Sequence, residues 1–159
     1  MENHTPEERV KEWLELFKGP QNQDLPRSCM ENVELVSCSA EGPHPKVVFS
    51  YTVDPRHCNI MSNLHGGIAA TLFDICTSLA LTLVARPGFW ERIGVSRNLS
   101  VNYIRPAPLG AEILIEGEIV HVGKKLAALR GVMKRRSDGA VLSTCTHDKA
   151  NSDPDTSKL

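Results

Sequence analysis

The chain has 159 residues, of which 41% are hydrophobic and 23% charged, values that fit one globular domain and leave too little length for a second. Eighteen Lys and Arg residues oppose nineteen Asp and Glu residues, and the net charge of -1 argues against a nucleic-acid-binding protein. The longest apolar run, 79–85, is far shorter than the roughly 20 residues that cross a membrane, and the acidic N-terminal region resembles neither a signal nor a transit peptide. We therefore expect no membrane segment and a cytosolic origin.

The cysteines and histidines follow no pattern that would hold a disulfide framework or a metal ion. The five cysteines are an odd number without a C-x-x-C pair, so we expect reduced thiols that act as small apolar residues. His57, Cys58 and His65 come nearest to a ligand cluster, but their spacing matches no known metal motif. We therefore predict no metal site and no cofactor.

The first predicted element is a helix over residues 5–17. Thr5-Pro6-Glu7-Glu8 has the order of a capping box with proline in the first turn. Its apolar residues fall on one face: Val10, Trp13, Leu14 and Phe17. Gly19-Pro20 ends the helix, whose apolar face we expect to pack on the main body, with a frayed arm as the alternative. The polar stretch 21–27 is interpreted as a connector.

Two β-rich segments and one long helix come next. Residues 33–39 and 46–53 flank the turn Glu41-Gly42-Pro43 and predict a hairpin. After a loop over 56–63, the chain has its only long helical pattern, which ends at Arg86-Pro87-Gly88 and carries apolar residues on more than one face. A helix that is apolar on most sides must be buried.

Four further strands are predicted over 93–104, 112–121, 126–134 and 140–147. Short turns separate them, and hairpin links force antiparallel pairing. Along the first of these strands the polar residues alternate on one face, which we interpret as lining solvent or the mouth of a site: Gly94, Ser96, Asn98, Ser100 and Asn102. The element order predicts an α+β fold, in which one antiparallel sheet wraps around one central helix.

The segment 59–67 runs directly into the long helix and is the first candidate for chemistry. Gly66 and Gly67 allow another group to approach the backbone closely, and the amides of the first helical turn have no partner within the helix. Such amides, aided by the helix dipole, can polarise a carbonyl or hold an oxyanion. The alternative is a tight turn without further role.

Asp74 is the only carboxylate in a helix otherwise filled with apolar and small residues. A buried charge is costly unless it is paired or functional, so Asp74 is either catalytic or an edge residue bonded to a nearby hydroxyl of Thr71, Thr77 or Ser78. It lies nine residues after His65, about 13 Å along the axis and near the opposite side of the helix. If the two cooperate, they must belong to different subunits, which predicts a twofold dimer with composite sites.

Three stretches resemble a known family: the segment 65–74, Gly94-Val95-Ser96 and Tyr103-Ile104-Arg105-Pro106-Ala107. Their order, between Val47 and His147, is similar to that of the hotdog-fold acyl-CoA thioesterases of the phenylacetate-pathway type, and most similar to the acyl-coenzyme A thioesterase 13 branch. The resemblance implies a hotdog fold around a helix over 66–86. It also implies two protomers that join their sheets as a homodimer or pair again as a homotetramer.

The resemblance implies a role for each residue of the site. Asp74 would activate a water molecule or attack the thioester carbon, and the Gly66 amide would polarise the carbonyl. His65 and Asn59 would support the thioester, and the Ser96 hydroxyl would help to position the water. Each supporting residue has a simpler reading: His65 as a helix cap, Asn59 as an Asx turn and Ser96 as an inward strand hydroxyl.

Coenzyme A carries phosphates, so its site should offer a few cations. Lys124 and Lys125 in a hairpin turn and Arg105 after its strand are the candidates, with solvated turn charges as the alternative; Gly67 at the helix start is assigned to substrate binding with them. The implied partners are therefore an acyl-CoA substrate and further copies of the chain, without nucleic acid or membrane.

The chain divides into three predicted parts: an N-terminal helix and connector (1–28), the hotdog domain (29–149) and a disordered tail (150–159). The tail ends in Ser157-Lys158-Leu159, the S-K-L address that a peroxisomal import receptor reads. We expect a peroxisomal location, with the cytoplasm as the alternative. If the N-terminal helix covers the pocket, it would restrict the length of the acyl chain.

The sequence thus predicts an enzyme that hydrolyses fatty acyl-CoA thioesters to the free acid and coenzyme A. An aryl-CoA thioesterase, acting on hydroxybenzoyl- or naphthoyl-type esters, is the first alternative. A non-catalytic module that binds acyl-CoA is the second. A hydratase on the same fold would need a different arrangement of Asp and His before the helix.

Overall fold

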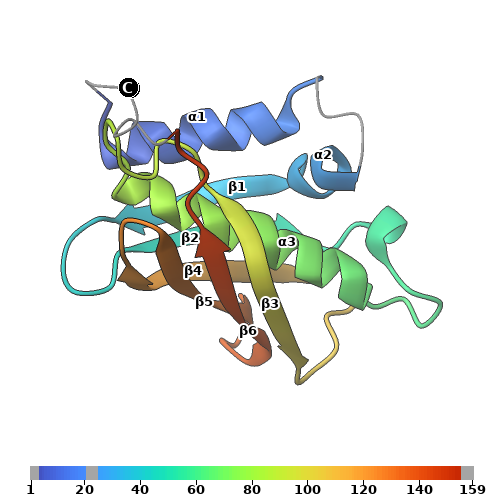
Figure 1. Ribbon diagram of the computed structural model, residues 1–159. Helices are drawn as coiled ribbons and strands as arrows, with labels where there is room; N and C mark the ends of the chain where they lie inside the picture. The colour runs from blue at the N-terminus through green and yellow to red at the C-terminus, as the bar shows by residue number, and fades with distance from the viewer. Residues whose placement is uncertain (1–3, 21–24, 155–159) are drawn as a thin grey trace.

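The computed structural model describes residues 4–20 and 25–154. Its helices are α1 (Pro6–Lys18), α2 (Leu25–Met30) and α3 (Gly66–Ala80), and 3-10 turns span Pro55–His57 and Leu81–Leu83. Its strands are β1 (Val33–Ser39), β2 (Lys46–Thr52), β3 (Val95–Tyr103), β4 (Glu112–Val122), β5 (Leu126–Arg135) and β6 (Val141–Ala150). They form one antiparallel sheet in the order β1-β2-β4-β5-β6-β3, which curves around α3, with α1 lying beyond α3 (Figure 1). This is the predicted α+β hotdog architecture with its additional N-terminal helix.

Helix α1 begins with the predicted capping box. The Glu8 N–H donates to Thr5 Oγ1 (3.2 Å), and the Thr5 N–H donates to the Glu8 carboxylate (2.7 Å). Val10 and Leu14 on its inner face are buried in the main core. The helix therefore packs on the body of the protein, as expected, rather than fraying.

Helix α2 forms where the sequence analysis expects the end of a connector over 21–27. It buries Cys29 and Met30 in the same core as Val10 of α1. The helix also crosses the boundary predicted at residue 28. The N-terminal segment and the sheet consequently share one core.

Helix α3 is shorter than the predicted helix to Arg86, because a 3-10 turn follows Ala80. The Arg9 guanidinium of α1 donates to the carbonyls of Thr82 (2.7 Å) and Leu83 (3.1 Å), which a longer helix would offer to its own next turn. The segment Gly66–Leu83 is long and apolar enough to span a membrane, but 67% of it is buried inside the fold. Its composition is that of a helix enclosed by a sheet.

Strand β3 pairs differently from the prediction. The hairpins β1–β2, β4–β5 and β5–β6 form, but β3 does not pair with β4, the next strand along the chain. It pairs with β6 at the edge of the sheet, and β4 pairs with β2. The link 106–110 instead bonds to the loop before α3: the Leu64 N–H donates to Ala107 O (2.8 Å) and the Leu109 N–H to Ser62 O (2.9 Å).

A β-bulge at Arg97 interrupts the alternation of β3. Ser96 pairs with Lys149 and Asn98 with Asp148, so Arg97 has no partner in β6. The extra residue turns Ser96 toward α3, where its hydroxyl reaches Asp74. The prediction of a single polar face that includes both Ser96 and Asn98 is therefore wrong.

The C-terminal segment is ordered beyond the predicted start of a disordered tail at residue 150. Ala150 is the last residue of β6, and the Asn151 N–H donates to Lys125 O (2.9 Å). The Asp153 carboxylate accepts from the backbone N–H groups of Glu91 (3.0 Å) and Arg92 (2.9 Å). The predicted address at 157–159 lies outside the described residues.

Candidate active site

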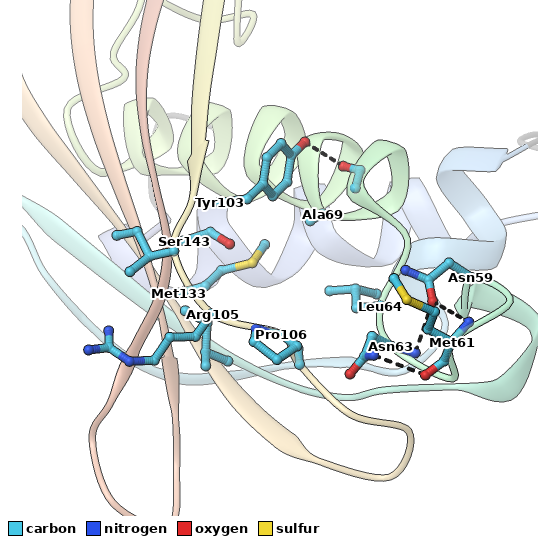
Figure 2. Close-up of a pocket in the computed structure, with 14 residues that line it drawn as sticks. Asn59, Met61, Asn63, Leu64, Ala69, Tyr103, Arg105, Pro106, Met133 and Ser143 are labelled. Atoms are coloured by element: carbon cyan, nitrogen blue, oxygen red, sulfur yellow. Dashed lines mark hydrogen bonds between the residues drawn. The ribbon is translucent and has the colours of Figure 1, made fainter.

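A cavity of about 340 Å³ lies where the loop 59–64, the start of α3 and the end of β3 meet (Figure 2). Its apolar wall includes Leu64, Ala69, Met133 and Leu142, and its polar lining includes Asn59, Asn63, Arg105 and Ser143. Of the described residues of α1, none lines this cavity. The N-terminal helix therefore does not cover this cavity, which was the condition for a limit on the length of the acyl chain.

Asn59 organises the loop that forms one side of the cavity. Its Oδ1 accepts from the backbone N–H groups of Met61 (2.9 Å) and Asn63 (3.2 Å), and the Asn63 side chain donates to Met61 O (2.9 Å) (Figure 2). This is an Asx turn, the simpler of the two readings of Asn59. Asn59 also lines the cavity, so the turn fixes its side chain beside the helix start.

The first turn of α3 presents backbone donors that have no acceptor within the helix. The Gly67 N–H donates to His65 Nδ1 (3.0 Å), so His65 caps the helix and engages the Gly67 amide. No group in the described part of the chain accepts the Gly66 N–H. Gly66, the first residue of the helix, is thus a donor that remains for a ligand.

Tyr103 packs directly on this helix start. Its hydroxyl donates to Gly66 O (2.7 Å), and a Cβ atom on Gly66 would lie 3.3 Å from the tyrosine ring (Figure 2). The close approach explains why a glycine suits position 66. The sequence analysis used Tyr103 only as part of the family resemblance and did not assign it to the site.

Asp74 lies in the middle of α3, with its side chain 43% exposed. Its Oδ1 accepts from the Ser96 hydroxyl on β3 (2.6 Å). The hydroxyls of Thr77 and Ser78 donate to backbone carbonyls of α3 instead. The partner of the carboxylate is therefore Ser96, and not a hydroxyl of its own helix.

His147 on β6 completes this cluster and is a residue that the sequence analysis missed. Its Nε2 lies 2.9 Å from Ser96 Oγ and 3.3 Å from Asp74 Oδ1, and its Nδ1 lies 2.7 Å from Thr77 Oγ1. Burial, reinforced by the charge of Lys149, lowers the pKa of His147 to about 4. The ring is therefore neutral at pH 7.

The inward positions of β6 carried a usable signal. Cys145, His147 and Lys149 alternate with exposed or half-buried residues, and all three are buried. The predicted strand ended at His147, so the analysis did not recognise two polar groups at successive buried positions. Polar residues at such positions indicate a functional cluster or a paired network.

The remaining candidates are distributed between the two ends of the sheet. Arg105 lines the cavity, donates to Val141 O (2.8 Å) and extends away from the loop at Asn59 (Figure 2). Lys124 and Lys125 lie in the turn between β4 and β5, at the opposite end of the strands from the cavity. Asp74 does not line the cavity either, so one protomer does not bring the whole predicted site together.

Comparison with known proteins gives the family. Residues 61–142 match the thioesterase superfamily. The chain belongs to this superfamily and is a thioester hydrolase, which confirms the family and the fold expected from the sequence. Acyl-coenzyme A thioesterase 13 of Mus musculus is 32% identical over 120 residues, which cover 76% of this chain and 80% of the relative.

Solved structures agree with this assignment. Zebrafish thioesterase superfamily member 2 has a TM-score of 0.78 at 26% identity, with 94% of this chain and 99% of that chain covered. A hypothetical thioesterase of Streptococcus pneumoniae TIGR4, solved with coenzyme A, has a TM-score of 0.66 at 25% identity, with 77% of this chain and 88% of that chain covered.

Proposed function

We propose that the protein hydrolyses acyl-CoA thioesters at two equivalent sites of a homodimer, each built from both copies. In each site, Asp74 of one copy is the general base, and the Gly66 N–H of the other copy holds the carbonyl oxygen. The observation that carries this proposal is the position of β3. One end of this edge strand contacts Asp74 through Ser96, and the other end contacts Gly66 through Tyr103.

The edge position of β3 supports the dimer. Among the described residues its backbone pairs with β6 alone, which leaves its other side available for a second copy. An antiparallel pairing centred on Ser100, in which the bulge at Arg97 takes up one residue, would set Ser96 opposite Tyr103 of the other copy. Because these two residues mark the two halves of the site, this twofold pairing unites the halves twice.

The reaction needs a base, an oxyanion donor and a means to position water. Oδ1 of Asp74 is held by Ser96, so Oδ2 takes the proton from water as the water oxygen attacks the thioester carbon. The Gly66 N–H stabilises the negative charge that forms on the carbonyl oxygen. Collapse of the tetrahedral intermediate breaks the carbon–sulfur bond, and the proton passes to the thiolate, which yields the acid and coenzyme A.

The apolar wall of the cavity and the position of two lysines favour a CoA ester with an apolar acyl group. The wall formed by Leu64, Met133 and Leu142 suits an acyl chain. Lys124 and Lys125 lie at the Ser96 end of β3, because Leu126 and Val95 both pair with Ala150. In the dimer they would approach the cavity of the other copy, where the phosphates of coenzyme A need cations.

A thiol-release assay over straight-chain and aromatic acyl-CoA esters tests the proposal. We expect turnover with straight-chain esters and its loss in Asp74→Asn. Turnover of aromatic esters alone would favour an aryl-CoA thioesterase. Binding of acyl-CoA without thiol release would favour a non-catalytic module and contradict the proposal.

We also propose peroxisomal import for a chain that ends at Leu159. The support comes only from Ser157-Lys158-Leu159 in the sequence. A fluorescent protein fused to the N-terminus should give punctate peroxisomal signal, and deletion of Leu159 should make it diffuse. Puncta that persist after the deletion would contradict the address.

A further inference from the structure

A buried cation lies behind Asp74 and has no part in the mechanism above. Lys149 is 3% exposed, and its ammonium donates to Ser78 Oγ (2.6 Å) and to Ser96 Oγ (3.4 Å). Within the ranges 4–20 and 25–154, no Asp or Glu forms an ion pair with it. Burial lowers the pKa of Lys149 although the nearby charge of Asp74 favours the ammonium, so the position is costly and stability alone does not account for Lys149.

We propose that Lys149 is a positioning residue that keeps His147 uncharged, so that the Asp74 carboxylate remains available as a base. The inference rests on the proposed function. His147 Nε2 lies 3.3 Å from Asp74 Oδ1. A protonated ring would donate to this carboxylate and hold it in an ion pair, which would weaken its ability to take a proton from water.

Two features of the cluster support this role. Lys149 and His147 occupy successive inward positions of β6, so the ammonium lies on the same buried side of the strand as the ring. Like charges repel strongly where water is excluded, so the ammonium opposes a second positive charge on His147. Burial and the charge of Lys149 both lower the pKa of His147.

Two negative charges near the His147 ring act against burial and Lys149. Asp74 from α3 and Asp148 from β6 both favour its protonation. Ser96 from β3 is a neutral hydroxyl, and the opposite positions of β5 are the apolar Leu129 and Ala127. Burial raises the pKa of Cys145 to about 12, so this nearby thiol stays neutral. Lys149 is therefore the cation that balances the two carboxylates.

The test compares three variants with the wild-type chain. Lys149→Met removes the charge at similar volume, Lys149→Gln removes it but keeps a donor for Ser78, and Lys149→Arg keeps it. Lys46→Met is the matched control, because Lys46 makes its ion pair with Glu116 on the outer face of the sheet. The pKa of His147 is measured by NMR of labelled histidine, assigned with His147→Gln, and kcat is measured against pH.

We expect the His147 pKa to rise by about one unit in Lys149→Met and Lys149→Gln, and to stay near the wild-type value in Lys149→Arg and Lys46→Met. The acid limb of the kcat profile should move to higher pH by the same amount, while rates at pH 8 agree within about twofold. The thermal midpoint of Lys149→Met should not fall, because a buried charge is removed.

Three results would overturn the inference. An unchanged His147 pKa would show that Lys149 does not control the ring, whatever the enzyme activity. A raised pKa with an unmoved acid limb would separate the ring from Asp74. Loss of folding in both neutral variants would make Lys149 a structural residue. Absence of thioester hydrolysis in the wild-type chain would instead overturn the proposed function, and the NMR result would still be readable.

Discussion

The helix start and the Asp74 cluster are the two halves of the proposed site, and they are built in different ways. At the helix start the reactive group is the backbone N–H of Gly66, which has no acceptor within the helix because Gly66 is its first residue, while His65 caps the amide that follows. Around Asp74 the reactive groups are side chains, which a bulge in β3 and buried positions of β6 bring together. The first half depends on local chain geometry, and the second on long-range pairing.

The largest effect is expected where one side chain carries the chemistry. Asp74→Asn keeps the shape of the side chain and its bond to Ser96 but removes the base, so kcat should fall by about 10³- to 10⁴-fold. Asp148→Asn, on the outer face of β6, is the control and should remain near the wild-type rate. Thiol release and circular dichroism measure the two effects. An Asp74→Asn enzyme of normal rate would remove the proposed base.

The backbone half can be tested through proline. Gly66 is the first residue of α3, a position where proline is well tolerated, and His65 already has the extended conformation that precedes a proline. Gly66→Pro deletes the N–H, so kcat should fall by about 10²- to 10³-fold relative to Gly66→Ala, which adds a Cβ but keeps the N–H. Equal rates in these two variants would argue against an oxyanion donor at this amide.

A hybrid dimer tests whether the two halves come from different copies. Asp74→Asn and Gly66→Pro copies are co-expressed with different tags, and the heterodimer is purified through both. One of its two sites then carries both defects and the other carries none, so activity should return to about half of the wild-type value per dimer. A heterodimer as inactive as both parent homodimers would show that each copy uses its own residues.

The same contrast explains what the sequence alone predicts. The capping box at Thr5, the hairpin of β1 and β2 and the helix that begins at Gly66 all depend on near neighbours, and the structure has each of them. The family resemblance also rested on local stretches, and it led to the correct fold. Local patterns therefore predict the elements that surround the helix start well.

Long-range pairing set the limits of the prediction. Nothing in the turn at 106–110 indicates that β3 avoids β4 and pairs with β6, because that choice depends on how the sheet curves around α3. The bulge at Arg97 follows from the same pairing, and it decides which way Ser96 points. His147 and Lys149 reach Asp74 through the pairing of β6 with β3, so polar residues at inward positions of β6 do not by themselves indicate which cluster they join.

The smallest effect is expected at Tyr103, which contacts the helix start but not the Asp74 cluster of its own protomer. Tyr103→Phe keeps the ring against Gly66 but removes the hydroxyl that donates to Gly66 O. One hydrogen bond of this kind contributes about 1 kcal/mol, so kcat should fall by about two- to tenfold. The loss should be the same at every pH, because Tyr103 does not contact the ring of His147, whose NMR pKa should be unchanged. A shift of the acid limb in Tyr103→Phe would mean that the Tyr103 hydroxyl is coupled to the protonation of an Asp74 cluster.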